Sequence, residues 1–154
     1  MGKNDSVRND ELLYRSVRSE SEVEEYFFDR GKLIIRPAAF NDKGKKPSVD
    51  RAELREFDPS LSKLNETDGI VSLIAGDIRG IKEVKTKAED KNVVHAVDVI
   101  YDPTPENSAH SQIIVAPEFF GTGSKQKRTF KKLRIALATL ATENGWTLEP
   151  PKVN

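Results

Sequence analysis

Apolar residues along the chain gather in short blocks that polar and charged segments separate. Residues 92–101 alternate most regularly, which places Val93, His95, Val97, Val99 and Tyr101 on one face of an extended strand. Shorter apolar blocks at 11–17, 32–36, 69–75 and 112–115 also predict strands, and residues 146–148 could pair as a last one. The pattern therefore predicts about five strands.

Helical spacing is clearest near the carboxyl end, over residues 125–144. Apolar residues recur there at intervals of three and four, and Asn144-Gly145 supplies a left-handed stop. A second, shorter helix is expected from about residue 19 to Gly31, because serines stand three residues before glutamates, which is the capping-box spacing. Its buried stripe would consist of Val23, Tyr26 and Phe27. A further helical turn is expected within residues 47–54.

The order of these elements is not a regular alternation of strands and helices. This favours an α+β fold: a single small domain with about five mostly antiparallel strands and two to three helices, the longest being C-terminal. We expect the domain to span residues 10–150, with residues 1–9 as a disordered leader and residues 151–154 as a tail. A chain of 154 residues is long enough to bury a core without cross-links.

Composition narrows the possible functions mainly through the absence of cysteine. The chain can form no disulfide, no thiolate metal site and no cysteine nucleophile. Its apolar runs fall short of the roughly 20 residues that cross a bilayer, and the polar N-terminus does not read as a secretory signal. We therefore expect a cytoplasmic protein, and no cofactor is predicted.

Charge is balanced overall, with 25 basic and 25 acidic residues, but it is unevenly distributed. Six cations and no acid stand between residues 124 and 134, at the start of the predicted long helix. Positive charge at a helix N-terminus opposes the helix dipole, so an anionic counterpart is expected. The alternatives are a solvated helix face or cover by the acidic segment 20–29. The candidate binding residues are Lys125, Lys127, Arg128, Lys131, Lys132 and Arg134.

The two histidines are interpreted differently. His95 lies within a strand on its more apolar face, which is typical of a core histidine. His110 lies in a loop before a strand, where a site residue is more common. His110 and Asp50 are the weak catalytic candidates, and Arg36 and Arg51, which flank a Gly/Lys-rich loop, could hold an anion. The spacing of the two histidines does not match a metal-binding helix, so no metal is predicted.

Four short blocks also carry a family resemblance: Leu13-Tyr14-Arg15, residues 36–40 (RPAAF), residues 48–51 (SVDR) and residues 107–110 (NSAH). In this order they resemble a family of small uncharacterised bacterial proteins with no established activity. The resemblance spans most of the chain and implies a bacterial origin. It also implies that one surface gathers the residues Arg36, Phe40, Ser48, Asp50, Arg51 and His110. It transfers no catalytic role.

Three functional hypotheses follow. The first is an interaction or adaptor module that docks on a protein partner through the basic helix start. The partner would have an acidic surface, which we favour over nucleic acid because the chain is neutral overall and its bases are not interleaved with aromatic residues. The second is a small enzyme acting on a nucleotide or RNA phosphate, with His110 as acid or base and Arg36 or Arg51 on the anion. The third is nucleic-acid binding without catalysis.

Overall fold

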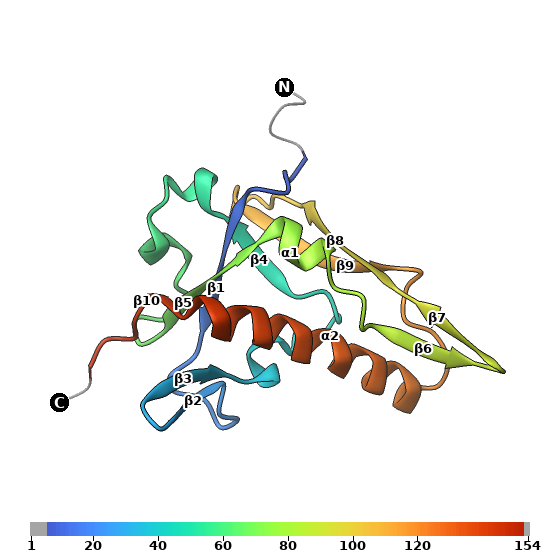
Figure 1. The fold of residues 1–154 in the computed structure, drawn as a ribbon. Helices are drawn as coiled ribbons and strands as arrows, with labels where there is room; N and C mark the ends of the chain where they lie inside the picture. Colours follow the sequence, from blue (N-terminus) through green and yellow to red (C-terminus); the bar gives the residue numbers. More distant parts are fainter. Residues whose placement is uncertain (1–5, 153–154) are drawn as a thin grey trace.

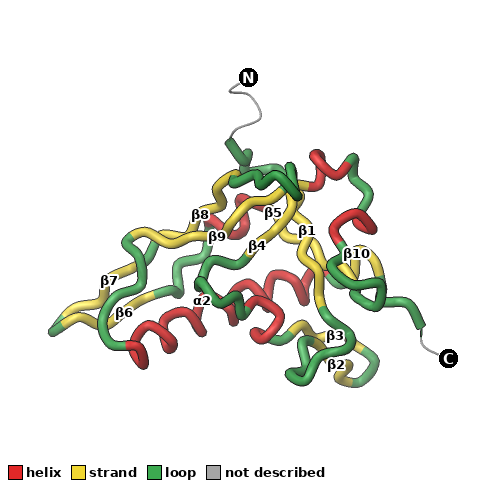
Figure 2. Tube along the Cα trace, turned by 180° about the vertical axis from the view of Figure 1, so that it is seen from behind, coloured by secondary structure: helices red, strands yellow, loops and turns green. Residues whose placement is uncertain are grey.

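The computed structural model describes residues 6–152. Within that range, a six-stranded antiparallel sheet with the order β10-β5-β1-β4-β9-β8 forms the centre of the fold. Its strands are β1 (Leu12–Val17), β4 (Ser48–Arg51), β5 (Gly69–Ile74), β8 (Ala96–Tyr101), β9 (His110–Ala116) and β10 (Trp146–Leu148). The long helix α2 (Gly123–Asn144) crosses one face of this sheet, as Figure 1 shows, and the view from behind places β4 and β9 in front of it (Figure 2).

Two separate hairpins complete the ten strands found in residues 6–152. They are β2 (Tyr26–Asp29) with β3 (Lys32–Ile35), and β6 (Lys85–Ala88) with β7 (Lys91–Val94). The described part also contains a short helix α1 (Ala75–Arg79) and three 3-10 helices, η2 (Pro37–Phe40), η3 (Ala52–Arg55) and η4 (Pro59–Ser62). The α+β class, the mostly antiparallel sheet and the long C-terminal helix are thus confirmed, whereas the predicted strand count of about five is wrong.

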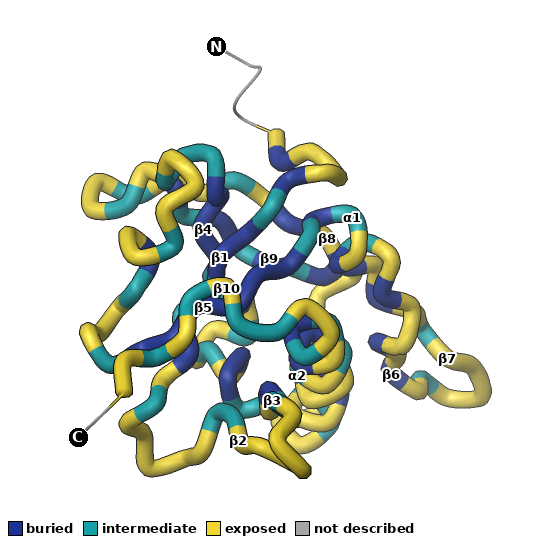
Figure 3. The backbone as a smooth tube through the Cα atoms, turned by 60° about the vertical axis from the view of Figure 1, so that its left-hand side comes forward, coloured by how far each residue is buried: buried dark blue, intermediate teal, exposed yellow. Residues whose placement is uncertain are grey.

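The main core lies between α2 and the sheet. Phe130, Leu133 and Leu137 of α2 pack with strand residues that include Val49 and Ile113, all of them buried. In Figure 3 the dark blue, buried stretches of β1, β4 and β9 lie next to α2. The opposite face of the sheet carries only a small second cluster, made of Tyr14, Ala52 and Ile70 with Leu12 and Leu148 beside it. One face of the sheet is therefore apolar and closed, and the other is partly open.

The helix expected over residues 19–31 is wrong: residues 19–25 form neither helix nor strand, and residues 26–35 fold as the β2–β3 hairpin. Arg30 and Gly31 both adopt positive φ, 53° and 80°, which is the backbone that a two-residue hairpin turn requires. Of the expected buried stripe, Tyr26 packs against the main core, whereas Val23 is 62% exposed and Phe27 39% exposed. Cross-strand pairing here outweighs the capping-box spacing.

The regular strand expected over residues 92–101 is interrupted. His95 separates β7 from β8, and its backbone N–H donates to the carbonyl of Val84 at 2.8 Å. The side chain is fully buried, with Nδ1 2.5 Å from the carbonyl of Pro117 and Nε2 2.7 Å from the hydroxyl of Thr86. His95 is thus a core histidine, as predicted.

The N-terminal segment differs from the expected disordered leader. Residues 1–5 lie outside the described residues, but Val7 is buried in the main core. Arg79, at the end of α1, donates to the carbonyls of Val7 and Val99 at 2.7 and 3.2 Å and to the carboxylate of Asp98 at 2.7 Å. These bonds fasten residues 6–9 and α1 to the edge strand β8.

A buried ion pair holds β4 to the start of β1. Arg51 is fully buried, and its guanidinium donates to both carboxylate oxygens of Glu11 at 2.8 Å while lying 4.8 Å from the centre of the Tyr101 ring. Burial raises the pKa of Glu11, but hydrogen bonds from Arg51 and from the Arg8 backbone outweigh it, and the net pKa lies below its ordinary value of 4.5.

We expect Arg51→Ala to lower the free energy of unfolding by about 3–5 kcal/mol, because it leaves the carboxylate of Glu11 buried without its main partner. Urea denaturation measures this loss. The matched control is Arg36→Ala, which breaks the exposed pair with Glu24 and should cost about 0–1 kcal/mol. Equal losses in the two variants would contradict the conclusion that the buried Arg51–Glu11 pair stabilises the fold.

The lowered pKa of Glu11 also predicts a dependence of stability on pH. A carboxyl whose pKa is depressed by folding stabilises the native state above its unfolded pKa, and this stabilisation is lost as the pH falls. Comparing wild type with Glu11→Gln by denaturation from about pH 6 to about pH 3 should therefore show a difference in stability that narrows in acid. A constant difference would show that Glu11 titrates alike in both states.

Candidate functional site

The basic residues of α2 form a continuous surface with strand β6. Lys127, Arg128, Lys131 and Lys132 are exposed. The Lys125 amine donates to the carbonyl of Lys87 at 3.1 Å and the Lys132 amine to that of Lys85 at 2.9 Å, so the exposed side chains of β6 lie beside those of the helix. We call this set the basic surface: Lys85, Lys87, Lys125, Lys127, Arg128, Lys131 and Lys132.

The basic surface has no carboxylate partner within residues 6–152. No ion pair joins any of its cations to an acid there, so the alternative in which the acidic segment 20–29 neutralises them is not supported. The helix begins two residues earlier than expected, because the Thr122 hydroxyl accepts from the Lys125 N–H and caps it. At the N-terminus of α2, the positive end of the helix dipole therefore adds to side-chain charges that have no carboxylate partner in the described residues.

Arg134 is separate from this surface. Its guanidinium lies 5.0 Å from the centre of the Phe130 ring, and Nε is buried without a hydrogen-bond partner in the described structure. Burial lowers the pKa of Arg134 from its ordinary value. Of the six cations predicted to bind, Arg134 thus packs against the core and five remain on the basic surface.

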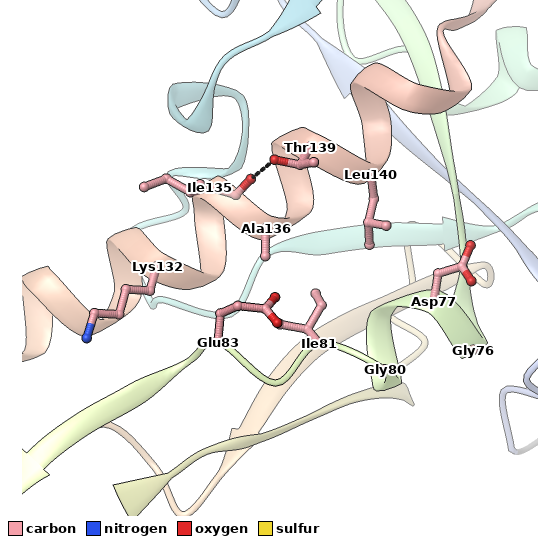
Figure 4. Close-up of a pocket in the computed structure, with 10 residues that line it drawn as sticks. All are labelled: Gly76, Asp77, Gly80, Ile81, Glu83, Lys132, Ile135, Ala136, Thr139 and Leu140. Carbon is pink, nitrogen blue, oxygen red and sulfur yellow. Dashed lines mark hydrogen bonds between the residues drawn. The ribbon is translucent and has the colours of Figure 1, made fainter. Parts of the chain in front are cut away.

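A shallow groove borders the basic surface, between α2 and the segment that follows α1 (Figure 4). Its volume is about 520 Å³, and its walls include Ile81, Ile135 and Leu140. Lys132 stands at one end and Asp77 at the other, with Glu83 between them. Ile135 is 46% exposed on the helix, so a large apolar side chain adjoins the cations.

A second, polar cleft of about 620 Å³ lies on the open face of the sheet. Along β4, Ser48 and Asp50 point to this face. Val49 and Arg51, at the alternate positions, are buried on the other face. β9 pairs with β4 in the register Asp50↔His110, which brings His110 into the same cleft. The structure thus brings together Ser48, Asp50 and His110, which were predicted to share a surface.

The remaining residues predicted for that surface lie elsewhere. Arg51 is buried and bonded to the carboxylate of Glu11, and Phe40 is buried in the main core. Arg36 pairs with Glu24 at 3.0 Å and is not among the residues that line the cleft. The period-two alternation of β4 explains the position of Arg51, because neighbouring strand residues face opposite sides.

Asp50 joins three segments across the floor of the cleft. Its carboxylate accepts hydrogen bonds from the Ser62 hydroxyl at 2.7 Å, the Asn107 amide at 2.8 Å and Arg55 Nε at 3.2 Å. Both oxygens are therefore occupied by donors from η4, the turn at 104–107 and η3. This arrangement fits a structural clamp better than a catalytic acid or base.

His110 has a defined orientation in the cleft. Nδ1 lies 2.7 Å from the carbonyl of Asp102, and Nε2 lies 3.0 Å from the hydroxyl of Ser48. A carbonyl only accepts, so Nδ1 carries the proton and Nε2 accepts from Ser48. Sequence reasoning named His110 but gave Ser48 no chemical role, because the two stand far apart along the chain and only the pairing of β4 with β9 joins them.

Arg15 shapes the wall of the cleft beside Ser48. The β1–β4 pairing covers only Leu13↔Arg51 and Tyr14↔Asp50, and the Arg15 guanidinium lies where the strands separate. It donates to the Ser48 carbonyl at 2.8 Å and to Asp42 at 2.6 Å, while the Ser48 N–H donates to Asp42 at 2.9 Å. Ser48 is therefore held by its main chain on both sides.

Comparison with known proteins adds no family or fold assignment: no family model, curated protein or solved structure matches the chain. Within residues 6–152, no helix is long and apolar enough to cross a membrane, and no cluster of three His, Asp or Glu side chains is placed to hold a metal ion. Functional argument therefore depends on the geometry of the basic surface and of the polar cleft.

We expect Asp50→Ala to lower the free energy of unfolding by about 2–3 kcal/mol, since it removes a charged acceptor and leaves three buried or half-buried donors without it. Chemical denaturation measures the loss. Asp90→Ala, in the exposed turn of the β6–β7 hairpin, is the control and should change stability by no more than about 0.5 kcal/mol. A small effect at Asp50 would argue that the clamp is not structural.

Proposed function

We propose that the protein is a cytoplasmic interaction module that docks an acidic, amphipathic segment of a protein partner. The observation that carries the proposal is the basic surface, which gathers seven cations without a carboxylate partner in the described part of the chain. A cytoplasmic setting agrees with the cysteine-free sequence, because reducing compartments do not support disulfides.

Neither the described lysines nor Arg18 and Arg30 form an ion pair, but most arginines outside the basic surface are internally compensated. Six of them lie 2.6–3.2 Å from a carboxylate: Arg8, Arg15, Arg36, Arg51, Arg55 and Arg79. In contrast, α2 contains no acidic residue before Glu143. Lys127 with Lys131, and Arg128 with Lys132, are like-charge i,i+4 pairs, each unfavourable by about 0.2–0.5 kcal/mol. This cost is recovered when an anionic surface binds.

The groove beside the basic surface supports a protein partner over nucleic acid. A docked segment can place an apolar side chain against Ile135 and Leu140 and a carboxylate beside Lys132, at the end of the groove away from Asp77. Surfaces that bind single-stranded nucleic acid instead combine cations with exposed aromatic rings on which bases stack. The nearest ring on this part of α2, Phe130, is buried.

The proposal predicts that Lys127→Glu/Arg128→Glu/Lys131→Glu weakens partner capture at least about tenfold, because three favourable contacts become repulsive. The melting temperature should hold or rise slightly, since no internal ion pair is lost and acids suit a helix N-terminus. Affinity purification from the native cell, in nuclease-treated lysate, followed by mass spectrometry and titration of the purified partner, measures the effect.

The matched control reverses three exposed cations outside the basic surface, Arg30→Glu/Lys32→Glu/Lys152→Glu, with the same change in net charge. It should retain the partner. Undiminished capture by the α2 variant would reject docking at the basic surface. Loss of capture after nuclease treatment, with affinity for a single-stranded RNA falling steeply with salt, would instead support nucleic-acid binding.

A further inference from the structure

We propose that the polar cleft is a second functional site, at which Ser48 and His110 catalyse acyl transfer from a carboxylic ester. The inference does not depend on the basic surface. It begins from the hydrogen bond between Ser48 Oγ and His110 Nε2, 3.0 Å long, inside an open cleft of about 620 Å³. A serine hydroxyl becomes a useful nucleophile when an adjacent base can take its proton.

The tautomer of His110 suits this role. The Asp102 carbonyl, 2.7 Å from Nδ1, accepts a hydrogen bond from Nδ1–H, which leaves the Nε2 lone pair facing Ser48. A carboxylate oxygen of Asp102 lies 3.7 Å from the same nitrogen, so the carbonyl and the carboxylate of this residue both stand beside Nδ1. His110 is the base, and Asp102 is a positioning residue.

The main chain holds the nucleophile still. The N–H and carbonyl of Ser48 are bonded to Asp42 and Arg15, and β4 pairs with β9 at this residue. Its side chain is half-buried and lines the cleft. Ser48 thus combines a fixed backbone with access to a ligand, which is the pre-organisation that nucleophilic catalysis requires.

The walls of the cleft indicate the class of substrate. Leu61 and Leu64 line one part and are 49% and 78% exposed, which suits a short acyl chain. Asn41 and Lys43, which precede Ser48 in the chain, line another part and carry N–H donors for a carbonyl oxygen or a polar leaving group. We therefore infer a small ester with a short acyl chain and a polar alcohol.

The reaction balances without a further reactant except water. Ser48 Oγ forms a bond to the carbonyl carbon as its proton moves to His110 Nε2, and the tetrahedral intermediate breaks its bond to the alcohol oxygen, which takes that proton. Water then attacks the acyl-serine and gives a proton to Nε2. Release of the carboxylic acid returns the proton to Ser48 Oγ.

The absence of cysteine allows a sharp test. Ser48→Cys introduces a single thiol whose alkylation by iodoacetamide reports how readily the neighbouring base takes its proton. We expect alkylation about 10–100-fold faster than in Ser21→Cys, an exposed serine outside the cleft, with the acceleration lost in Ser48→Cys/His110→Gln. Asp102→Asn in the same background should reduce the rate severalfold without changing the melting temperature.

The unmodified serine is tested in the wild-type protein with a fluorophosphonate probe and with p-nitrophenyl acetate. We expect one covalent adduct, mapped to Ser48 by mass spectrometry, and ester hydrolysis that falls about 100-fold in Ser48→Ala and in His110→Gln but not in Ser21→Ala. Equal alkylation rates at positions 48 and 21, or labelling and hydrolysis that persist in Ser48→Ala, would overturn the proposal. Thermal melts of every variant separate these outcomes from unfolding.

Discussion

The core on the closed face of the sheet and the polar cleft on its open face both depend on the alternation of side chains along β4. In four residues the strand sends Val49 and Arg51 to the closed face and Ser48 and Asp50 to the open one. The closed face receives the apolar side of α2 and the buried Arg51–Glu11 pair. A slip of one residue would exchange the two sets, burying a serine and an aspartate in the core.

The two candidate sites therefore lie on separate parts of the fold. The basic surface belongs to α2 and β6, whereas residues of β4 and β9 line the polar cleft on the open face of the sheet. Figures 1 and 2 show α2 on the other face. Their electrostatics differ in kind. In the cleft, Arg15 and Arg55 meet Asp42 and Asp50, so charge there serves to position groups. On α2 the charge has no internal counterpart in the described chain and acts outward.

Much of the fold follows from periodicity in the sequence, and the errors share one cause. The helix over 125–144 and the strand at 69–75 were found because each buries one continuous apolar pattern. The β2–β3 hairpin was missed because its pairing depends on positive φ at Arg30 and Gly31, for which Asp29-Arg30-Gly31 was the available signal. For the site, local reasoning found His110 and the α2 cations, but only strand register joins Ser48 to His110, and no pattern within one segment reveals that contact.

The bonds that Arg79 makes to β8 have a consequence for self-association. An edge strand offers unpaired N–H and carbonyl groups that can template a strand from another chain. At the middle of β8, however, the Arg79 guanidinium donates to the carbonyl of Val99. The N–H of Val99 donates to the carboxylate of Asp98. The opposite edge, β10, is three residues long and is followed closely by two prolines. Fibril growth by continuation of the sheet is thus disfavoured at both ends, although neither edge is covered by another strand.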